Sequence, residues 1–474
     1  MKLKLNFILL VTSYLFSSCA TTSPKSIPLT YKDEINKILN DSIFEGTQVA
    51  IKVISLKNDR VLFSKNENLL MRPASNLKLI TSSTAISVLK DTFNFRTNFY
   101  FDSTTSSIFV KGSGNPIFSS SDLKKVVNQI KNLGFKEIKG NVIGDVSLFD
   151  TLQWGEGWMW DDEPFMYAAF NSALTINNNC IKIIATPSKN GEAVNISTFP
   201  KTNYVNLKNF ATTSDSTLNF NITRKFFERT NDIIVSGNLN YNSKPDTTTL
   251  TILYPEKYFV NLFYEELLNQ GIIVKGKPII SNLTEKAKLI YTHSQSIDSV
   301  IINFNKVSDN LTGENLLKVI GNNATNNAGS TTAGISVVKN YLNKIGIDTN
   351  KFLLVDGSGM SHYNLITANL YTQLLKSIYN DKINFPLIYN SLPIAGIDGT
   401  LSNRFLNNAA FKIVRAKTGS IGGVSTLSGF VTTRSNEMLA FSILMQNFIG
   451  SASKYRNAQD RICEVLALIS DTSK

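Results

Sequence analysis

The sequence predicts an α+β fold in which one antiparallel sheet is flanked by helices and a large β-rich insertion forms two smaller domains. Strand-like segments lie near both ends of the chain and helical segments lie between them, an order that fits one sheet with helices on its faces. Between residues 96 and 286 the texture changes to short strand-like runs rich in Asn, Thr and Ser. With 474 residues, the chain is long enough for several domains.

The segment before the insertion begins with a strand pair. Residues 48–56 and 60–63 have the composition of two strands, and the Lys-Asn-Asp sequence between them favours a turn. After a Pro-Ala pair, apolar residues recur at helical spacing, which predicts a helix from residue 75 to about residue 90.

The remaining elements follow from the same two periodicities. Helical spacing of apolar residues marks two segments of the insertion and several later ones: 123–133, 258–268, a segment near 296, 311–320, 333–345 and 368–379. A hairpin series and a last helix complete the chain: strands at 411–416, 424–432 and 438–445, and a helix at 455–469.

The N-terminus has the composition of a secretory signal, because a basic start precedes an apolar run at residues 5–16 and then small residues. The run is too short to span a membrane permanently. A Ser-Ser-Cys sequence ending at Cys19 resembles a bacterial lipoprotein cleavage box, which would make Cys19 the lipidated first residue, although Phe16 replaces the usual aliphatic residue. The alternative is a signal with an incidental cysteine. We expect a signal or lipoprotein segment at 1–19, a linker at 20–30, and export to the periplasm of the bacterial cell envelope.

Charge and the scarcity of His and Cys exclude several functions. The net charge of +12 comes from scattered Lys without an Arg-rich patch interleaved with aromatic residues, so nucleic-acid binding is not expected. His293 and His362 are the two histidines and form no His-x-x-x-His pair, so we expect neither a metal site nor a cofactor. Cys180 and Cys463 are expected as buried thiols, although a periplasmic disulfide between them stays open.

Three short motifs, far apart in the chain, together describe one active site. They are Ser75-Asn76-Leu77-Lys78, Ser308-Asp309-Asn310 and Lys417-Thr418-Gly419. Each is weak alone, but the first lies where a loop enters an apolar helix, the second between helices, and the third at the end of a strand. This ordered triplet is typical of serine enzymes that are acylated by D-alanyl peptides or β-lactams.

Ser75 and Lys78 are the expected nucleophile and base. Three residues apart on a helix, they share one face, so their side chains can meet. The helix N-terminus and a nearby cation disfavour a further positive charge, so Lys78 would be neutral often enough to take the serine proton. The alternative is a solvent-facing Ser and Lys on an amphipathic helix.

Ser308 and Asn310 supply a hydroxyl and an amide from one loop. The hydroxyl can relay a proton to the leaving amine, and the amide can hold a substrate amide. The alternative, compatible with the first, is that Ser308 or Asp309 caps the following helix.

Lys417 adds positive potential, while Thr418 and Ser420 can bind a terminal carboxylate. Gly419 lets a ligand lie close to the backbone. The backbone N–H groups of Ser75 and Ser420 are the expected oxyanion hole. The alternative is a polar hairpin turn.

The chain resembles the class C low-molecular-mass penicillin-binding proteins, a family of D-alanyl-D-alanine carboxypeptidases that also act as endopeptidases. The resemblance covers about residues 35 to 470. It rests on these segments: Arg72-Pro-Ala-Ser-Asn-Leu-Lys-Leu-Ile-Thr81, Gly157-Trp-Met-Trp-Asp-Asp162, Ser172-Ala-Leu-Thr-Ile-Asn-Asn-Asn179, Asp356-Gly-Ser-Gly-Met-Ser361, Leu392-Pro-Ile-Ala-Gly-Ile-Asp-Gly-Thr400 and Ala416-Lys-Thr-Gly-Ser420.

The resemblance implies a penicillin-binding or serine β-lactamase-like domain. This domain would be built from residues 30–95 and 287–474, with residues 96–286 inserted as an accessory region of two subdomains. The long separation of Ser75 from Ser308 supports this, because compact class A β-lactamases have these motifs several-fold closer.

The resemblance also implies a substrate-binding role for Asp162, which matches an acidic residue near the family's Trp-rich segment. His362 departs from the family, where this position is often Arg and can help to bind the peptide side chain. The preference for the third residue of the stem peptide is therefore left open.

We expect a serine-type D-alanyl-D-alanine carboxypeptidase and endopeptidase that forms an acyl-enzyme on Ser75. Its partners would be peptidoglycan stem peptides ending in D-Ala-D-Ala, β-lactams as covalent inhibitors, and the membrane through the lipid anchor. One alternative is a β-lactamase or esterase on the same scaffold, which would deacylate quickly. The other is a catalytically idle wall-binding protein, which would have a damaged triplet.

Overall fold

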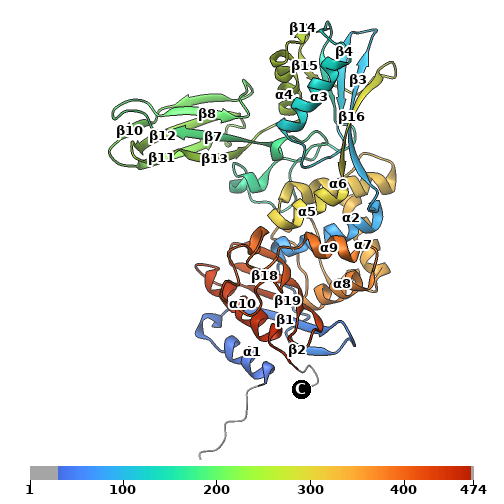
Figure 1. The fold of residues 1–474 in the computed structure, drawn as a ribbon, viewed down its shortest axis with the longest axis vertical. Coiled ribbons are helices and arrows are strands. Elements are labelled where there is room, and N and C mark those ends of the chain that lie inside the picture. The colour runs from blue at the N-terminus through green and yellow to red at the C-terminus, as the bar shows by residue number, and fades with distance from the viewer. Residues whose placement is uncertain (1–29, 471–474) are drawn as a thin grey trace, which may run out of the picture.

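The computed structural model describes residues 30–470 (Figure 1). The expected signal segment at 1–19, Cys19 and the linker as far as residue 29 lie outside the described residues. Figure 1 shows an elongated molecule with one sheet at the bottom, helices above it, and the insertion at the top with a lobe that projects to the left. None of the described helices is long and apolar enough to cross a membrane.

The sheet at the bottom is antiparallel and combines strands from both ends of the chain, in the order β17-β18-β19-β1-β2. Its strands are β1 (Gln48–Ser55), β2 (Val61–Lys65), β17 (Arg415–Ile421), β18 (Val424–Thr432) and β19 (Met438–Gln446). β1 pairs with β19 from Gln48 opposite Gln446 to Ser55 opposite Leu439. The predicted α+β fold with an antiparallel sheet is confirmed.

The strand predicted at 411–416 begins later, at Arg415. The residues before it form turns, with backbone bonds from Phe411 N to Asn408 O and from Val414 N to Ala410 O. Ala410 and Val414, four residues apart, are fully buried, whereas the intervening Phe411 is 36% exposed. Turn spacing rather than strand alternation therefore decides which side chains are buried.

Helices cover both faces of this sheet. Successive side chains of a strand point to opposite faces, so Val49, Ile51 and Val53 pack with α1 (Tyr31–Leu39) and α10 (Ser453–Ala467). Ala50 and Ile54 belong to the core on the other face. The helices of that core are α2 (Lys78–Leu89), α5 (Ile297–Val307), α6 (Asn310–Thr325), α7 (Thr331–Lys344), α8 (Ala368–Asn380) and α9 (Phe385–Ser391).

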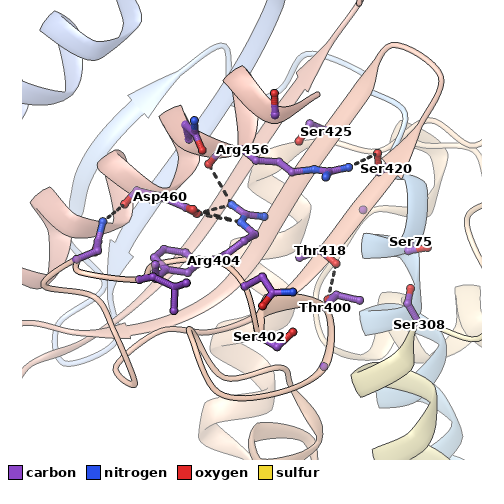
Figure 2. A pocket seen from close by; sticks show the side chains of 18 of the residues that line it. Ser75, Ser308, Thr400, Ser402, Arg404, Thr418, Ser420, Ser425, Arg456 and Asp460 are labelled. Atoms are coloured by element: carbon purple, nitrogen blue, oxygen red, sulfur yellow. Dashed lines mark hydrogen bonds and ion pairs between the residues drawn. The ribbon is translucent and has the colours of Figure 1, made fainter. Parts of the chain in front are cut away.

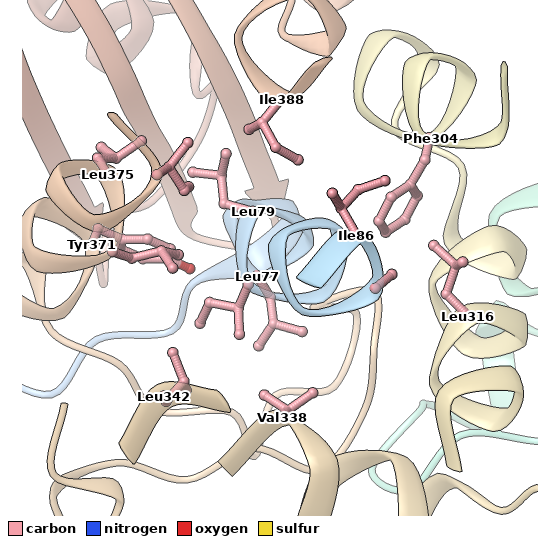
Figure 3. Close-up of a cluster of buried hydrophobic side chains, with 14 of the residues drawn as sticks. Leu77, Leu79, Ile86, Phe304, Leu316, Val338, Leu342, Tyr371, Leu375 and Ile388 are labelled. Atoms are coloured by element: carbon pink, nitrogen blue, oxygen red, sulfur yellow. The ribbon is translucent and has the colours of Figure 1, made fainter. Parts of the chain in front are cut away.

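Helix α2 is enclosed by this core. Figure 3 shows its side chains surrounded by apolar residues of the neighbouring helices, including Phe304, Leu316, Leu342 and Leu375. Every residue from Lys78 to Ile86 is buried. Such close packing holds the helix in one position, and it also fixes the residues at its N-terminal end.

The insertion forms two β-rich lobes (Figure 1). The upper lobe has the sheet order β15-β6-β4-β3-β16, built from β3 (Asn94–Asp102), β4 (Ser107–Lys111), β6 (Val142–Asp145), β15 (Pro278–Ile280) and β16 (Lys288–Ser296). The same lobe holds the short pair β5 (Glu137–Ile138) and β14 (Ile273–Val274) with helices α3 (Ser120–Asn132) and α4 (Pro255–Asn269). β16 pairs with β3, so the sheet of the insertion extends past residue 287 to Ser296.

The projecting lobe is made of two small sheets, β13-β7-β8 and β10-β12-β11, with β9 paired to β12. Its strands are β7 (Cys180–Thr186), β8 (Asn195–Phe199), β9 (Asn206–Asn209), β10 (Thr212–Ser214), β11 (Leu218–Arg224), β12 (Asp232–Asn240) and β13 (Asp246–Thr251). One continuous apolar cluster runs through both lobes.

Candidate active site

The three predicted motifs lie side by side at the edge of the sheet that β17 forms. Ser75 is in a 3₁₀ turn (Ala74–Leu77) that leads directly into α2 at Lys78. Ser308 follows the last residue of α5, and Asn310 is the first residue of α6. Asp309, not Ser308, caps α6, because its carboxylate accepts the Thr312 N–H at 2.9 Å.

The third motif occupies the interior of β17 rather than the end of a strand, because β17 continues from Lys417 to Ile421. This strand runs against the turn that carries Ser75. A Cβ added to Gly419 would lie 2.8 Å from the Pro73 carbonyl oxygen and 3.0 Å from the Asn76 nitrogen. Close packing against the turn that carries Ser75 therefore requires glycine at position 419.

Lys78 and Ser75 form the central contact of the site. Lys78 Nζ donates to Ser75 Oγ at 2.8 Å and to Asn310 Oδ1 at 2.6 Å. Lys78 is fully buried, and this burial lowers its pKa to about 8. A lysine with this pKa is partly neutral near pH 7, as a general base must be.

Three nearby acidic side chains oppose the effect of burial: they raise the pKa of Lys78 and so favour its charged form. They are Asp356, Asp309 and Glu314. Glu314 is buried, and burial together with Asp356 raises its pKa to about 8. Its carboxylate accepts the backbone N–H groups of Gly357 and Ser358. The Ser358 carbonyl oxygen in turn accepts from Lys78 Nζ at 2.7 Å.

The backbone is strained beside Ser75. Ala74 has φ of 45°, a left-handed conformation that non-glycine residues seldom adopt. Gly359 packs directly on it: at φ of 83°, an added Cβ would lie 1.9 Å from the Ala74 carbonyl oxygen. The loop at 356–361 therefore presses against the turn of Ser75 and supplies a carbonyl oxygen to Lys78.

Lys417 and Ser308 form a second lysine–serine pair. Lys417 Nζ donates to Ser308 Oγ at 2.8 Å and to the Thr418 carbonyl oxygen at 3.1 Å. Burial, together with the nearby charge of Lys78, holds the pKa of Lys417 well below its usual range. The two pairs give the site two hydroxyls, each with an amine as its proton partner.

Neighbouring residues connect these parts. Asn76 is fully buried and bonds to Ser428 of β18 at 2.8 Å; with its amide nitrogen turned toward β17, it also donates to the Lys417 carbonyl oxygen at 2.6 Å. From the insertion, Asn178 donates to Asp309 Oδ1 at 3.0 Å, and the Tyr167 carbonyl oxygen accepts from the Asn310 amide at 2.7 Å. The insertion therefore directly contacts the loop that carries Ser308, Asp309 and Asn310.

Two cavities meet at Ser75, Ser308 and Ser420. The first, called here the large cleft, has a volume of about 1020 Å³, and Figure 2 shows Thr400, Thr418, Arg404 and Arg456 along it. Thr418 donates to Thr400 across the cleft at 2.7 Å.

The second, called here the small cavity, has a volume of about 540 Å³ and is lined by Met159, Met360, Asp162, Tyr167 and His362 among others. Asp162 lies at this cavity and accepts a hydrogen bond of 2.9 Å from the Tyr167 hydroxyl. Burial and Arg72 lower the pKa of His362, while Asp162 opposes this change. The small cavity thus combines apolar side chains with one acid and one imidazole.

Comparison with known proteins identifies the family. The model of the D-Ala-D-Ala carboxypeptidase 3 (S13) family matches residues 31–468. The chain belongs to this family. The S13 carboxypeptidase function predicted from the sequence is thereby confirmed, as is its class as a serine-type penicillin-binding hydrolase.

Two curated relatives cover most of this S13 carboxypeptidase. A D-alanyl-D-alanine carboxypeptidase of Actinomadura sp. (strain R39) is 31% identical over 443 residues, which is 89% of this chain and 82% of the relative. D-alanyl-D-alanine carboxypeptidase DacB of Haemophilus influenzae is 27% identical and covers 85% of this chain and 86% of the relative.

The fold is also that of solved penicillin-binding proteins. Penicillin-binding protein 4 (dacB) of Haemophilus influenzae superposes with a TM-score of 0.81 at 23% identity, covering 92% of this chain and 99% of the solved chain. The same protein complexed with a β-lactam superposes with a TM-score of 0.75 at 22% identity, with the same coverage.

Several residues of the S13 site carry contacts that the sequence analysis did not assign. Glu314, Asp356 and Gly359 support Lys78 and Ser75, and Asn178 reaches the site from the insertion. Most of them lie in segments quoted for the family resemblance, which was the available signal. The two described cysteines, Cys180 and Cys463, are buried and free. No group of three or more His, Cys, Asp or Glu side chains suited to a metal occurs within residues 30–470.

Proposed function

We propose that Ser75 is the nucleophile of this carboxypeptidase and Lys78 its general base, acting on wall peptides that end in D-Ala-D-Ala. The observation that supports this proposal is the 2.8 Å contact between Lys78 Nζ and Ser75 Oγ, together with the lowering of the pKa of Lys78 to about 8. No other described lysine both contacts this hydroxyl and shares its turn of chain.

The reaction then follows from the two lysine–serine pairs. Ser75 Oγ gives its proton to Lys78 and bonds to the carbonyl carbon of the penultimate D-Ala. The backbone N–H groups of Ser75 and Ser420 stabilise the resulting oxyanion. As the C–N bond breaks, Ser308, held by its hydrogen bond with Lys417, gives its hydroxyl proton to the leaving amine and regains one from Lys78, which becomes neutral again. Lys78 then takes a proton from the water that attacks the ester, and this proton returns to Ser75 Oγ as the ester C–O bond breaks.

Substrate binding divides between the two cavities. The hydroxyls of Thr418, Thr400 and Ser420 in the large cleft suit the free carboxylate of the terminal D-Ala. The small cavity, with Asp162 and His362, suits the side of the peptide that remains on the enzyme. Asn310 lines the small cavity and can hold the peptide amide.

We also propose a division of the chain into a penicillin-binding domain and an insertion. The sequence predicts residues 30–95 and 287–474 for the first and residues 96–286 for the second, and the shared sheet of β1 and β19 supports joining the two parts of the first. Because β16 pairs with β3 of the insertion, we propose the second boundary after Ser296 instead of at 287.

The substrate places the enzyme in the cell envelope. Wall peptides lie outside the cytoplasm, so a secretory segment at 1–19 with lipidation of Cys19 suits the activity. Release from the membrane tests this proposal: a Cys19→Ala variant should be recovered in the soluble periplasmic fraction. If the variant is retained in the membrane fraction as fully as the wild type, lipidation is contradicted.

Covalent inhibition by β-lactams is part of this proposal, because a β-lactam offers a strained amide and a carboxylate to the same groups. Ser75→Ala should abolish covalent labelling by a fluorescent penicillin. Ser87→Ala, a change further along the same helix, should label like the wild type. Undiminished labelling of the Ser75 variant would show that another residue is the nucleophile, and rapid loss of the label from the wild type would favour a β-lactamase.

A further inference from the structure

A row of exposed aromatic and methionine side chains lies beside the small cavity. Met159 and Tyr167 line this cavity, and the segment between them also exposes Trp160, Phe165 and Met166. Trp160 alone is 65% exposed. Proteins seldom leave large apolar side chains exposed so close together unless the surface binds something.

Two phenylalanines from the loop between β11 and β12 extend this row. Phe227 is 74% exposed, and its ring centroid lies 5.2 Å from that of Trp160 and 4.2 Å from that of Phe226. The ring planes of Trp160 and Phe226 meet at only 19°. These three rings are called here the aromatic platform. Because Trp160 and Phe227 are mostly exposed, both keep ring surface open to a ligand.

The chain is anchored on both sides of Trp160. Before it, Trp158 Nε1 donates to Asp356 at 3.1 Å, and the loop of Asp356 borders the active site. After it, the carboxylate of Glu163 is buried and pairs with Arg224 of β11 at 2.5 Å. The two anchors fix the platform relative to the active site, so little conformational entropy is lost when a ligand binds to it.

Polar groups lie next to the rings. A third cavity, called here the outer cavity, has a volume of about 410 Å³ and is lined by Trp160, Thr151 and Arg229 among others. Arg229 is exposed, and within residues 30–470 its side chain forms no hydrogen bond or ion pair. Its backbone N–H bonds to the Phe226 carbonyl oxygen at 3.0 Å, so it belongs to the same turn as the platform. The outer cavity thus combines an aromatic face with a hydroxyl and a guanidinium group.

This combination suits a sugar ring. The C–H groups on one face of a sugar pack against an aromatic face, whose partial charge is negative, and its hydroxyl and acetamide oxygens accept hydrogen bonds from a guanidinium group. An anionic lipid surface is disfavoured, because Asp161 and Asp162 directly follow Trp160.

The position of the platform suits a sugar on the substrate itself. Trp160 directly follows Met159 of the small cavity, so their Cα atoms are about 3.8 Å apart. Three residues precede the D-Ala pair of a pentapeptide and span about 10 Å when extended. A sugar attached to the first of them would therefore lie a short way beyond the small cavity, on the side of the peptide that stays on the enzyme.

We propose that the aromatic platform and Arg229 bind an amino sugar of the glycan strand that carries the stem peptide. The proposal rests on the proposed function and extends its substrate from a bare peptide to a peptide still attached to glycan. The bonds made and broken at Ser75 are unchanged. The sugar contributes binding energy at a surface that the peptide alone does not reach.

The test compares a free-acid pentapeptide with the same pentapeptide carrying an N-acetylglucosaminyl-N-acetylmuramyl disaccharide. We expect wild-type kcat/KM to be about 10-fold higher with the disaccharide, and Trp160→Ala/Phe227→Ala to lose this preference, which is the scale for removing aromatic anchors from an interface. Phe210→Ala removes another exposed phenylalanine of the projecting lobe and should keep the wild-type preference. Acylation by benzylpenicillin, measured on every variant, reports the state of Ser75.

Peptide-free glycan chains give the second arm, because their binding does not depend on Ser75. Calorimetry should detect binding to the wild type and to Phe210→Ala after both are acylated by benzylpenicillin, and none to the double variant.

Three outcomes would contradict one of the two proposals. Equal wild-type kcat/KM on both peptides, or an undiminished preference in the double variant, would overturn the inference and leave the proposed function standing. A dimer in light scattering that the double variant lacks would show that the rings face a second copy of the chain, and would also overturn the inference. A wild type inactive on both peptides would overturn the proposed function, whereas calorimetry would still test the glycan site.

Discussion

Asn178 of the insertion donates a hydrogen bond of 3.0 Å to Asp309, which stands between Ser308 and Asn310. Asp309 also caps α6, so this bond joins the insertion to the loop that carries Ser308 and Asn310. The position of Ser308 and Asn310 depends on both the helix cap and the insertion.

Removing this bond should slow catalysis with little effect on folding. We expect Asn178→Ala to lower the rate of acylation by benzylpenicillin about 10-fold, which corresponds to the lower end of the roughly 1.5–3 kcal/mol that a hydrogen bond to a charged group contributes. Asn178→Asp should be slower still, since it opposes Asp309 with a like charge. Asn190→Ala, an exposed asparagine of the same insertion, is the matched control. Wild-type acylation in Asn178→Ala would show that the bond does not position the loop.

The pKa of Lys78 sets the pH dependence of acylation. Only the neutral amine takes the serine proton, and at a pKa of about 8 the neutral fraction at pH 7 is about one tenth. The rate should therefore rise about tenfold per pH unit below pH 7 and level off above pH 8. Stopped-flow acylation between pH 6 and 9.5 measures this.

A Glu314 variant tests whether the pKa of Lys78 determines the midpoint of the pH profile. Only the ionised form of Glu314 favours the charged form of Lys78, and because the pKa of Glu314 is raised to about 8, this form is populated mainly at pH 8 and above. Glu314→Gln should therefore move the midpoint of the pH profile to lower pH, with little change in the profile below pH 7. A midpoint that moves upward, or a wild-type rate that does not vary with pH, would contradict the role of Lys78 as base.

Gly359 should tolerate no side chain. Gly359→Ala places a Cβ against the Ala74 carbonyl oxygen and should lower the free energy of unfolding by about 3 kcal/mol or more, with loss of penicillin labelling. Gly346 has φ of 84°, almost the same as the 83° of Gly359, but has nothing within 4 Å of an added Cβ. Gly346→Ala should therefore show the backbone cost alone, about 1 kcal/mol. If chemical denaturation gives the same loss of unfolding free energy for Gly359→Ala and Gly346→Ala, the backbone at Ala74 can move aside without cost.

The hydroxyls beside Ser75 should recognise a free carboxylate. Amidating the C-terminus of a pentapeptide removes the charged acceptor for Thr418, Thr400 and Ser420, so kcat/KM should fall at least about 10-fold. Thr418→Val should reduce the difference between free-acid and amidated peptides, because it removes one of the donors. Equal kcat/KM for both peptides in the wild type would show that this end of the cleft recognises another group.

The Ser75–Lys78 contact could be predicted because the two residues share one turn, so residue type and spacing were sufficient. Lys417 and Ser308 lie 109 positions apart, so their contact was expected only from the order of the three motifs. The shift of β17 could not be predicted, since the burial of Ala410 and Val414 is decided by distant parts of the chain.

The supporting residues are non-local, and for this reason residue patterns alone did not reveal them. Glu314 acts through the backbone of Gly357 and Ser358, 43 and 44 positions away. Arg456 lies 36 positions from Ser420, on a helix whose periodicity indicates only an amphipathic surface. Contacts of this kind depend on how sheet and helices pack, and no motif encodes them.

The pairing of β1 with β19 has a consequence for biosynthesis. The side chains of Gln48 and Gln446 bond to each other although they are 398 positions apart. At about 5–20 residues per second, a ribosome needs about 20–80 s to make the intervening chain, and during that time β1 has no partner on one of its edges. Such long-range pairing makes folding slow. The nascent hydrolase therefore cannot complete the sheet beside Ser75 until its last strands exist.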